Sequence, residues 1–223
     1  MNYKNIDLVI FDCDGVLVDS EMISSRVLSE IFADIGLSLS AQDIYEKFRG
    51  GSMANTLQYV EDQLDGPIPI DLEGEYRKRS FIAYRDEMQA VDGIETVLQD
   101  LQVKKCVGSN GPQSKIKINL EVTGLIQYFN EDAIHSAYDI NKWKPLPDLY
   151  LYAAKKHLVN PENCLVIEDS LHGAEAAQAA GMSCIGYAAD TAADDFKSLG
   201  AIPVNDMLEI QRIFPHIFAS LHM

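Results

Sequence analysis

The sequence predicts an α/β protein in which a block of helices interrupts a doubly wound parallel sheet. Two observations predict this fold. From about residue 93 onward, short apolar runs typical of buried strands alternate with segments of helical periodicity. Residues 20 to about 90 instead contain helical periods and little strand. We therefore expect a Rossmann-like core from residues 1–18 and 91–223, and an α-helical cap from residues 19–90.

Four apolar runs are the candidate strands of the sheet. They are short, as buried strands are, and turn or helix signals separate them. Ligands of doubly wound sheets bind beyond the carboxyl ends of the strands, so the residues that follow these runs are of special interest. The runs are IDLVIF (6–11), VKKCVGS (103–109), NCLVIED (163–169) and SCIGYA (183–188).

The segments between the later strands carry helix signals. Asp92 and Glu95 have the spacing of a capping box before the run ETVLQDL. Further helices are predicted from Pro112 to a stop at Gly124, over the amphipathic run LPDLYLYAAKKH, and from a Ser170 cap to a stop at Gly181.

Three helices are predicted in the inserted block. The first has an apolar residue at every fourth position before a glycine stop, and the other two have apolar residues at helical spacing on either side of the break GPIPI. We interpret the block as a cap over the site. The apolar positions are Ile23, Val27, Ile31 and Ile35 before Gly36, then Leu57, Val60 and Leu64, then Leu72, Tyr76 and Ala83.

Composition limits the classes of partner and the location. The formal net charge of -16 argues against nucleic acid and anionic membrane surfaces as partners. An anionic small molecule is not excluded, because the Debye length is about 8 Å at physiological salt and a local cation can dominate a pocket.

No apolar run approaches the ~20 residues that span a bilayer, and the start MNYKNIDLVIFD lacks the features of a signal peptide. We expect a cytoplasmic monomer or homodimer.

The cysteines are expected to be buried free thiols. Cys13, Cys106, Cys164 and Cys184 lie among apolar neighbours in or beside strand-like runs, which is typical of buried thiols in a reducing compartment. None belongs to a Cys-x-x-Cys pair, so their spacing argues against a zinc site.

Acidic residues follow two of the predicted strands. Asp12 and Asp14 come after the first strand, and Glu168 and Asp169 end the run at 163–169. If these strands are parallel neighbours, four carboxylates converge at one end of the sheet. Two carboxylates ~4 Å apart repel by about 4 kcal/mol at an effective dielectric constant of about 20, so the cluster requires a divalent cation, a shared proton or both. The candidate ligands are all oxygens, which favours Mg²⁺.

Asp-x-Asp-Gly has two other possible meanings, a calcium-binding loop and a plain turn. An EF-hand needs glycine at the sixth position of its loop, and counting from Asp12 that position is Leu17. A plain turn after a strand is the common meaning of an isolated Asp-Gly pair, but a second acidic pair after another strand weakens it.

Ser109, Asn110 and Lys144 are the candidate phosphate-binding residues. Ser109 and Asn110 lie between a predicted strand and a predicted helix, where a hydroxyl, an amide and backbone N–H groups form an anion site. Lys144 lies between Trp143 and Pro145, where a rigid loop would direct its charge to a phosphate or to the carboxylates. Taken singly, the first two could be an ordinary helix cap and the lysine a solvated surface residue.

Together these groups predict phosphoryl transfer. One carboxylate takes the phosphoryl group and a cation neutralises its charge. A second carboxylic acid handles the proton of the leaving group. The pair in DCDG therefore suggests one aspartate that attacks and another that exchanges protons.

The motifs DCDGVLVDS, SN after a strand, KP-x-PD-x-Y and EDS-x-x-G resemble, in this order, the four motifs of the haloacid dehalogenase superfamily. The resemblance covers the whole chain and is closest to the phosphatase and β-phosphoglucomutase-like branch with an α-helical cap. It implies a Mg²⁺-dependent phosphatase of a small phosphomonoester, a sugar phosphate or a sugar-acid phosphate such as 6-phosphogluconate. It implies an aspartyl-phosphate intermediate.

The resemblance also implies a role for each motif residue. Asp12 corresponds to the nucleophile, and Asp14 to the general acid/base that offers its backbone carbonyl to Mg²⁺. Asp12 and Asp169 correspond to carboxylate ligands of the metal, with Glu168 a direct or water-mediated one. The groups that hold the phosphate correspond to Ser109, Asn110 and Lys144, and the lysine also steadies the nucleophile.

Three functions remain in view. Dehalogenases lack the second aspartate of the first motif, so Asp14 argues against dehalogenation. The related mutases carry a histidine where this chain has Ser24, and an arginine where the loop FRGGSMAN has Met53, so a plain phosphatase is favoured over a phosphomutase. A non-catalytic binding module on the same fold is the third possibility.

Arg49 in the loop FRGGSMAN is either a contact for an anionic part of the substrate or a surface arginine.

Overall fold

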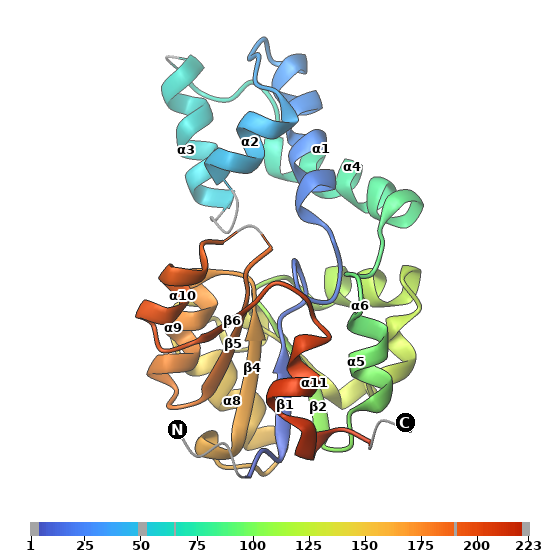
Figure 1. Ribbon diagram of the computed structural model, residues 1–223. Coiled ribbons are helices and arrows are strands. Elements are labelled where there is room, and N and C mark those ends of the chain that lie inside the picture. The colour runs from blue at the N-terminus through green and yellow to red at the C-terminus, as the bar shows by residue number, and fades with distance from the viewer. Residues whose placement is uncertain (1–4, 49–52, 65, 190, 220–223) are drawn as a thin grey trace. The chain divides into compact units, whose positions relative to one another are not determined.

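The structure is a computed structural model that describes residues 5–48, 53–64, 66–189 and 191–219. Its chain divides into two compact units (Figure 1). One unit contains residues 1–18 and 90–223, and the other contains residues 19–89.

The first unit is built on a six-stranded parallel sheet with the order β3-β2-β1-β4-β5-β6. This confirms the predicted α/β fold with a doubly wound parallel sheet. All four predicted strands are present. The short strands β3 and β6 were not predicted. The strands are β1 (Leu8–Phe11), β2 (Lys104–Ser109), β3 (Ile134–Ser136), β4 (Cys164–Glu168), β5 (Ser183–Tyr187) and β6 (Ile202–Val204).

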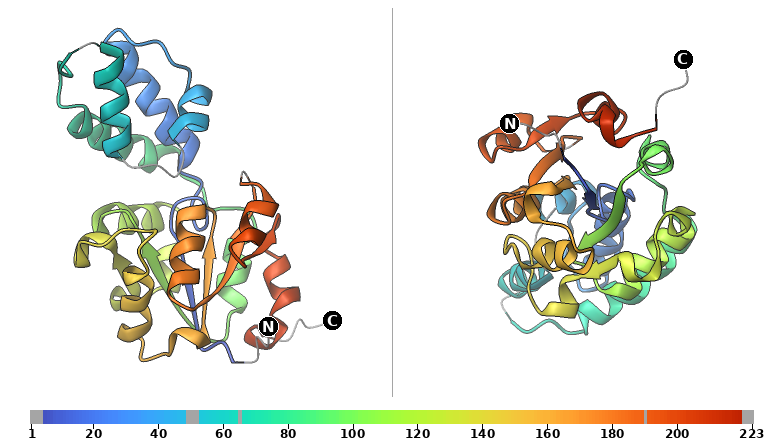
Figure 2. Two further views of the ribbon diagram at one scale, coloured as in Figure 1. Left: turned by 90° about the vertical axis from the view of Figure 1, so that its left-hand side faces the viewer. Right: turned by 90° about the horizontal axis from the view of Figure 1, so that it is seen from below.

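Helices cover both faces of this sheet (Figure 2). On one face, α8 packs against β1, β2 and β3, and its neighbour α9 packs against β4 and β5. On the opposite face, Lys105 of β2 donates to the carbonyl of Leu98 in α5. The helices are α5 (Ile94–Asp100), α6 (Gln113–Val122), α7 (Ala137–Ile140), α8 (Asp148–Lys156), α9 (Leu171–Ala179), α10 (Ala193–Ser198) and α11 (Glu209–Ile213), with 3-10 turns at Leu125–Tyr128, Glu131–Ala133, Pro161–Asn163 and Pro215–Ile217.

Of two predicted helix caps, one is confirmed and the other is wrong. Ser170 caps α9 as predicted, because its hydroxyl accepts a hydrogen bond from the N–H of Gly173 at 3.1 Å. The capping box predicted at Asp92 is wrong. Helix α5 begins after Gly93, which has a left-handed φ of 80° and makes no side-chain cap bond. The glycine takes the position before the helix, so Asp92 lies one residue too early to cap it.

The register of the strands aligns their carboxyl ends. Phe11 of β1 lies level with Val107 of β2 on one side and with Ile167 of β4 on the other. Asp12, which follows Phe11, and Glu168, which follows Ile167, therefore reach the carboxyl edge of the sheet at the same level. This edge is where parallel α/β sheets place their ligands.

In the described residues of the second unit, four helices surround a small apolar core of their own. Three of them match the predicted helices, and α2 was not predicted. Ile23 and Ile35 of the predicted apolar face are only partly buried, while Val27 and Ile31 are buried. The helices are α1 (Glu21–Asp34), α2 (Ala41–Phe48), α3 (Met53–Leu64) and α4 (Leu72–Glu87). In the described part of the chain, no helix is both long and apolar enough to cross a membrane.

Candidate active site

Three carboxylates gather at the carboxyl edge of the sheet. Asp12 follows β1, Glu168 is the last residue of β4, and Asp169 comes directly after it. One oxygen from each of the three lies within 4.8 Å of the others. The backbone N–H of Asp12 donates to the carbonyl of Ile167 at 3.0 Å, which fixes the aspartate beside the end of β4. The pairing of β1 with β4 therefore creates the cluster.

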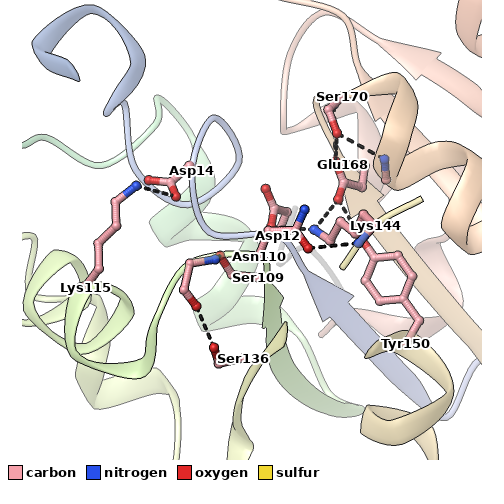
Figure 3. A network of polar contacts seen from close by, with 12 residues as sticks. Asp12, Asp14, Ser109, Asn110, Lys115, Ser136, Lys144, Tyr150, Glu168 and Ser170 are labelled. Atoms are coloured by element: carbon pink, nitrogen blue, oxygen red, sulfur yellow. Dashed lines mark hydrogen bonds and ion pairs between the residues drawn. The ribbon is translucent and has the colours of Figure 1, made fainter. Parts of the chain in front are cut away.

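Lys144 reaches into this cluster from the loop before α8 (Figure 3). Its Nζ lies 2.6 Å from Oδ1 of Asp12 and 2.5 Å from Oε1 of Glu168. The side chain is only 4% exposed, so the structure places this lysine in the protein interior and not at the surface. Although burial alone would lower it, the pKa of Lys144 is raised by the two carboxylates, and the ammonium group keeps its charge.

Glu168 is fully buried and hydrogen bonded on both oxygens. Oε1 accepts from Lys144 and, at 2.5 Å, from the hydroxyl of Tyr150. Oε2 accepts from the backbone N–H of Ser170 at 3.2 Å and from its hydroxyl at 2.9 Å. The first turn of α9 approaches so closely that a Cβ at Gly173 would lie 1.9 Å from the Glu168 carboxyl. Protein donors therefore occupy all four lone-pair directions of this carboxylate.

The carboxylates of the cluster favour a bound proton or cation. Burial raises the pKa of Asp12 to about 7, and the neighbouring Glu168 adds to this rise, while Lys144 opposes it. Lys144 contacts Asp12 and Glu168 of the three carboxylates. Carboxylates that lie close together in a buried site take up a proton or a cation. The donor set contains only oxygens, which fits Mg²⁺.

The backbone of Gly15 lies directly against the carboxylate of Asp169. The glycine has a φ of +79°, and a Cβ built on it would lie 2.2 Å from Oδ2 of Asp169. Its N–H donates to the carbonyl of Val18 at 2.8 Å, which closes the turn after Asp14. The turn therefore needs glycine for two reasons, the left-handed backbone and the approach of the carboxylate.

Ser109 and Asn110 lie at the end of β2, on the same edge. The Ser109 hydroxyl accepts from the N–H of Gly111 at 3.0 Å, and Gly111 in turn offers its carbonyl to the hydroxyl of Ser136 at 2.6 Å. Oδ1 of Asn110 accepts from the backbone N–H of Lys144 at 3.0 Å. This bond connects the loop after β2 with the lysine loop, so the three residues predicted to bind phosphate come together.

Asp14 does not join the other carboxylates. Its Oδ2 lies 2.8 Å from Nζ of Lys115, and the side-chain amide of Asn119 donates to its Oδ1 at 3.4 Å. Figure 3 shows Asp14 and Lys115 to one side of the pair formed by Asp12 and Lys144. The cluster within 4.8 Å therefore contains three of the four predicted carboxylates, whereas Asp14, whose charge still raises the pKa of Asp12, pairs with Lys115 of α6.

Sequence reasoning missed Tyr150 and Lys115. Tyr150 is a fully buried residue of the amphipathic α8, where an aromatic side chain is expected to be core, and only its hydroxyl reveals its part in the network. Lys115 is far from Asp14 in sequence and is one of two lysines in its predicted helix. Tyr150 is the last residue of the motif KP-x-PD-x-Y, but no role was predicted for it, and Lys115 belongs to none of the four motifs. Arg49, the predicted substrate contact, lies outside the described residues.

Comparison with protein families gives one match over most of the chain. The model of the haloacid dehalogenase-like hydrolase family matches residues 9–187. This range contains the carboxylates, the lysine and the loop after β2.

Individual proteins are also similar to the chain. It is 35% identical over 189 residues to the 6-phosphogluconate phosphatase of Escherichia coli, covering 84% of this chain and 85% of that protein. It is 29% identical over 197 residues to hexitol phosphatase B of the same species, covering 86% and 88%. Among solved structures, a hydrolase of Deinococcus radiodurans with bound phosphate and sodium superposes with a TM-score of 0.80 at 31% identity, covering 96% of each chain.

Proposed function

Since this chain belongs to the haloacid dehalogenase-like hydrolase family and is a phosphatase, we propose that it depends on Mg²⁺ and hydrolyses a small sugar-acid phosphate. In this proposal the reaction proceeds through an aspartyl-phosphate. The observation that carries the proposal is the buried contact of Lys144 with Asp12 beside Asp169. A lysine at this position holds a carboxylate ready to attack and offers positive charge to the phosphate that approaches it.

Mg²⁺ would be held by the oxygens at the carboxyl edge. In this proposal Asp12 and Asp169 supply carboxylate ligands, and Asp14 supplies its backbone carbonyl. Because protein donors already occupy both oxygens of Glu168, this residue would act through a water molecule and by positioning Lys144. The bound cation would neutralise the charge that gathers on the phosphoryl group.

Asp12 is the proposed nucleophile. Its Oδ1 is engaged by Lys144, which leaves Oδ2 to attack phosphorus. The new bond from Oδ2 to phosphorus forms as the ester bond from phosphorus to the substrate oxygen breaks. Water then attacks the phosphorus of the aspartyl-phosphate, which releases phosphate and regenerates the Asp12 carboxylate. Lys144 stays charged throughout and fixes the orientation of the carboxylate.

Asp14 is the proposed general acid and base. It would give its proton to the oxygen of the leaving group in the first step, and take one from the attacking water in the second. In the structure its carboxylate is held by Lys115 at 2.8 Å. A rotation of the Asp14 side chain away from Lys115 would therefore precede the proton transfer.

Ser109, Asn110 and Lys144 are the proposed phosphate-binding groups. Since Oδ1 of Asn110 accepts from the backbone of Lys144, the amide nitrogen is the group it offers to a phosphate oxygen. The Ser109 hydroxyl, which accepts a bond from Gly111, keeps its own proton to donate. With the Lys144 ammonium, these donors bind the phosphoryl group but do not read the rest of the substrate.

Substrate selection is assigned to the helical unit. We propose that residues 19–90 act as the cap and that Arg49 meets the carboxylate of a sugar-acid phosphate. The similarity to a 6-phosphogluconate phosphatase supports 6-phosphogluconate as the first substrate to test, and the similarity to a hexitol phosphatase makes hexitol phosphates its main competitors. Ser24, which stands where related mutases carry a histidine, is hydrogen bonded to Tyr84 at 2.6 Å within the helical unit, and this favours hydrolysis over phosphomutase activity.

A substrate panel tests the proposal. Phosphate release is measured from 6-phosphogluconate, hexitol phosphates and hexose phosphates, first with Mg²⁺ and then with excess EDTA. We expect the highest kcat/KM for 6-phosphogluconate, and loss of turnover on chelation. Turnover that persists in EDTA would contradict the Mg²⁺ requirement. A hexose 1-phosphate that isomerises without releasing phosphate would replace hydrolysis with phosphomutase activity, and a higher kcat/KM for a hexitol phosphate would replace the substrate class.

A further inference from the structure

A second cluster of metal-binding side chains lies outside the candidate active site. It contains Cys106, His135 and His157, and one ligand atom from each lies within 4.8 Å of the others. Cys106 and His135 are buried and His157 is partly exposed. The mechanism proposed above uses none of these residues.

The fold brings these three residues together from separate elements. His135 is the middle residue of β3 and pairs with Gly108 of β2, on the same side of the sheet as Cys106. Helix α8 covers this side, since a Cβ at Gly108 would touch the ring of Tyr150. His157 directly follows α8, and its carbonyl accepts from Nζ of Lys104 at the start of β2, at 2.9 Å. The backbone at each position is thus fixed by the sheet or by a hydrogen bond to it.

The separation of the two imidazole nitrogens is close to that in a tetrahedral metal site. Nε2 of His135 and Nε2 of His157 lie 3.1 Å apart, facing each other. Two imidazole nitrogens bound to one zinc ion at about 2.0–2.1 Å lie about 3.3–3.4 Å apart in a tetrahedron. A small outward movement of the two rings would therefore admit the ion between them. Without a metal, one ring must donate its N–H to the other for them to lie so close.

We propose that Cys106, His135 and His157 bind Zn²⁺ with a thiolate and two imidazoles, and that the fourth position is open to water on the exposed side of His157. A thiolate and two imidazoles form a borderline-soft donor set that favours zinc, in contrast to the oxygen donors at the carboxyl edge. The spacing of the cysteines argued against a zinc site, but that argument concerns ligands that are close in sequence. This site draws one ligand from each of β2, β3 and the end of α8.

The protonation states are compatible with this site. Burial is the largest cause that lowers the pKa of His135 to about 4, and it also lowers the pKa of His157, so both imidazoles are neutral at pH 7. Burial raises the pKa of Cys106, so the free residue is a thiol. Binding therefore forms one sulfur–zinc bond and releases the thiol proton to solvent.

The surrounding charges act in both directions. The Asp132 carboxylate favours positive charge at both imidazoles. Asp139 favours it at His135, whereas Lys156 opposes it there and Lys104 opposes it at His157. The thiolate formed at Cys106 adds negative charge inside the cluster itself. Because the ion would connect the end of α8 to β2 and β3, binding should also raise the melting temperature.

Cobalt is the probe that reports the sulfur ligand. EDTA-treated protein, transferred into excess Mg²⁺, is titrated with Co²⁺ and followed by visible and near-ultraviolet absorption. We expect a thiolate-to-cobalt charge-transfer absorption that saturates at one Co²⁺ per chain and disappears when Zn²⁺ displaces the cobalt. Cys106→Ser should abolish this absorption, whereas Cys164→Ser, a change at another buried cysteine of the same sheet, should leave it.

His157→Gln provides a variant that is expected to fold, because the side chain is partly exposed. It should weaken Zn²⁺ binding by at least ~10-fold, and it should remove most of the rise in melting temperature that Zn²⁺ causes. His216→Gln, at an exposed histidine, is the control. The proposal is overturned if wild-type protein shows no charge-transfer absorption, if Cys106→Ser retains it, or if His157→Gln binds Zn²⁺ as the wild type does.

Discussion

At the scale of single residues, Lys144 is the group on which the site depends most. It is buried between Asp12 and Glu168, so Lys144→Met would leave two carboxylates buried without their cation. We expect the variant to lose activity and to be destabilised by about 3 kcal/mol or more, since removing one partner of a buried ion pair leaves a buried charge without compensation. Urea unfolding monitored by circular dichroism measures the loss.

Lys142→Met is the matched control, because Lys142 is an exposed lysine of the same loop. It should change neither stability nor turnover by a measurable amount. The deficit of Lys144→Met should also shrink as the pH falls below about 7, because protonation of Asp12, whose pKa burial raises to about 7, removes part of the uncompensated charge. A variant as stable and as active as the wild type at pH 7 would disprove the role of Lys144.

A second prediction concerns the pH dependence of Mg²⁺ binding. Burial raises the pKa of Asp12 to about 7, so the metal-free protein holds this proton below pH 7 and loses it above. Binding of Mg²⁺ requires the carboxylate form, so at pH 6 it should release about 0.9 proton and at pH 8 only about 0.1. Affinity should therefore fall as the pH drops below 7.

Calorimetry in two buffers of different ionisation enthalpy measures the protons released. Equal release at pH 6 and pH 8 would show that Asp12 does not carry the raised pKa.

Residues of the site differed in how well sequence could locate them. Asp12, Glu168 and Asp169 follow apolar strand-like runs, so strand pairing alone brings them together. Lys144, the cation beside Asp12 and Glu168, was also predicted from its loop. The motif KP-x-PD-x-Y contains Tyr150 but does not show that its hydroxyl reaches Glu168, and no motif shows that Lys115 reaches Asp14.

At the scale of elements, the tight turn after β1 can be tested by comparing alanine substitutions at two glycines. Gly15 and Gly36 both have left-handed backbones, with φ of +79° and +84°. A Cβ at Gly15 would lie 2.2 Å from the Asp169 carboxylate, whereas one at Gly36 would meet nothing within 4 Å. Gly36→Ala should therefore cost only the backbone strain, about 1–2 kcal/mol, and keep its activity.

Gly15→Ala should have the same strain and also displace Asp169, so we expect activity to fall by at least ~100-fold. Thermal unfolding and turnover of both variants test this difference. Equal activity of Gly15→Ala and Gly36→Ala would contradict the position assigned to Asp169.

Elements were predictable from sequence when they carried a repeated apolar signal. β1 and β4 are buried along their whole length, and their apolar runs predict them. β6 is a three-residue edge strand that contains Pro203, and β3 has only three residues, so neither has a run long enough to recognise. Helix α2 has Ala41, Ile44 and Phe48 at helical spacing, but it is only eight residues long, and so short a segment is a weak signal of a helix.

At the scale of the whole molecule, the net charge of -16 predicts how rate depends on salt. An anionic substrate is repelled at long range, although the site itself offers local cations. Raising the ionic strength from about 0.01 M to about 0.15 M shortens the Debye length from ~30 Å to ~8 Å and screens the repulsion. We expect kcat/KM for 6-phosphogluconate to rise over this range, and to rise more than for an uncharged-sugar phosphate.

Stopped-time phosphate assays at substrate concentrations well below KM measure this slope. A decrease of kcat/KM with salt would contradict this prediction. It would mean that the substrate is attracted by local positive charge, either in the site or in residues that the structure does not describe.

The central claim for the molecule is that Asp12 takes the phosphoryl group. The measurement that tests it most directly is kcat for phosphate release from 6-phosphogluconate, with Mg²⁺, for wild type and Asp12→Asn. Circular dichroism establishes that the variant is folded. We predict a loss of at least ~10⁴-fold, since no other group of the site can replace the nucleophile. A folded Asp12→Asn variant with kcat within about tenfold of the wild type would contradict the account.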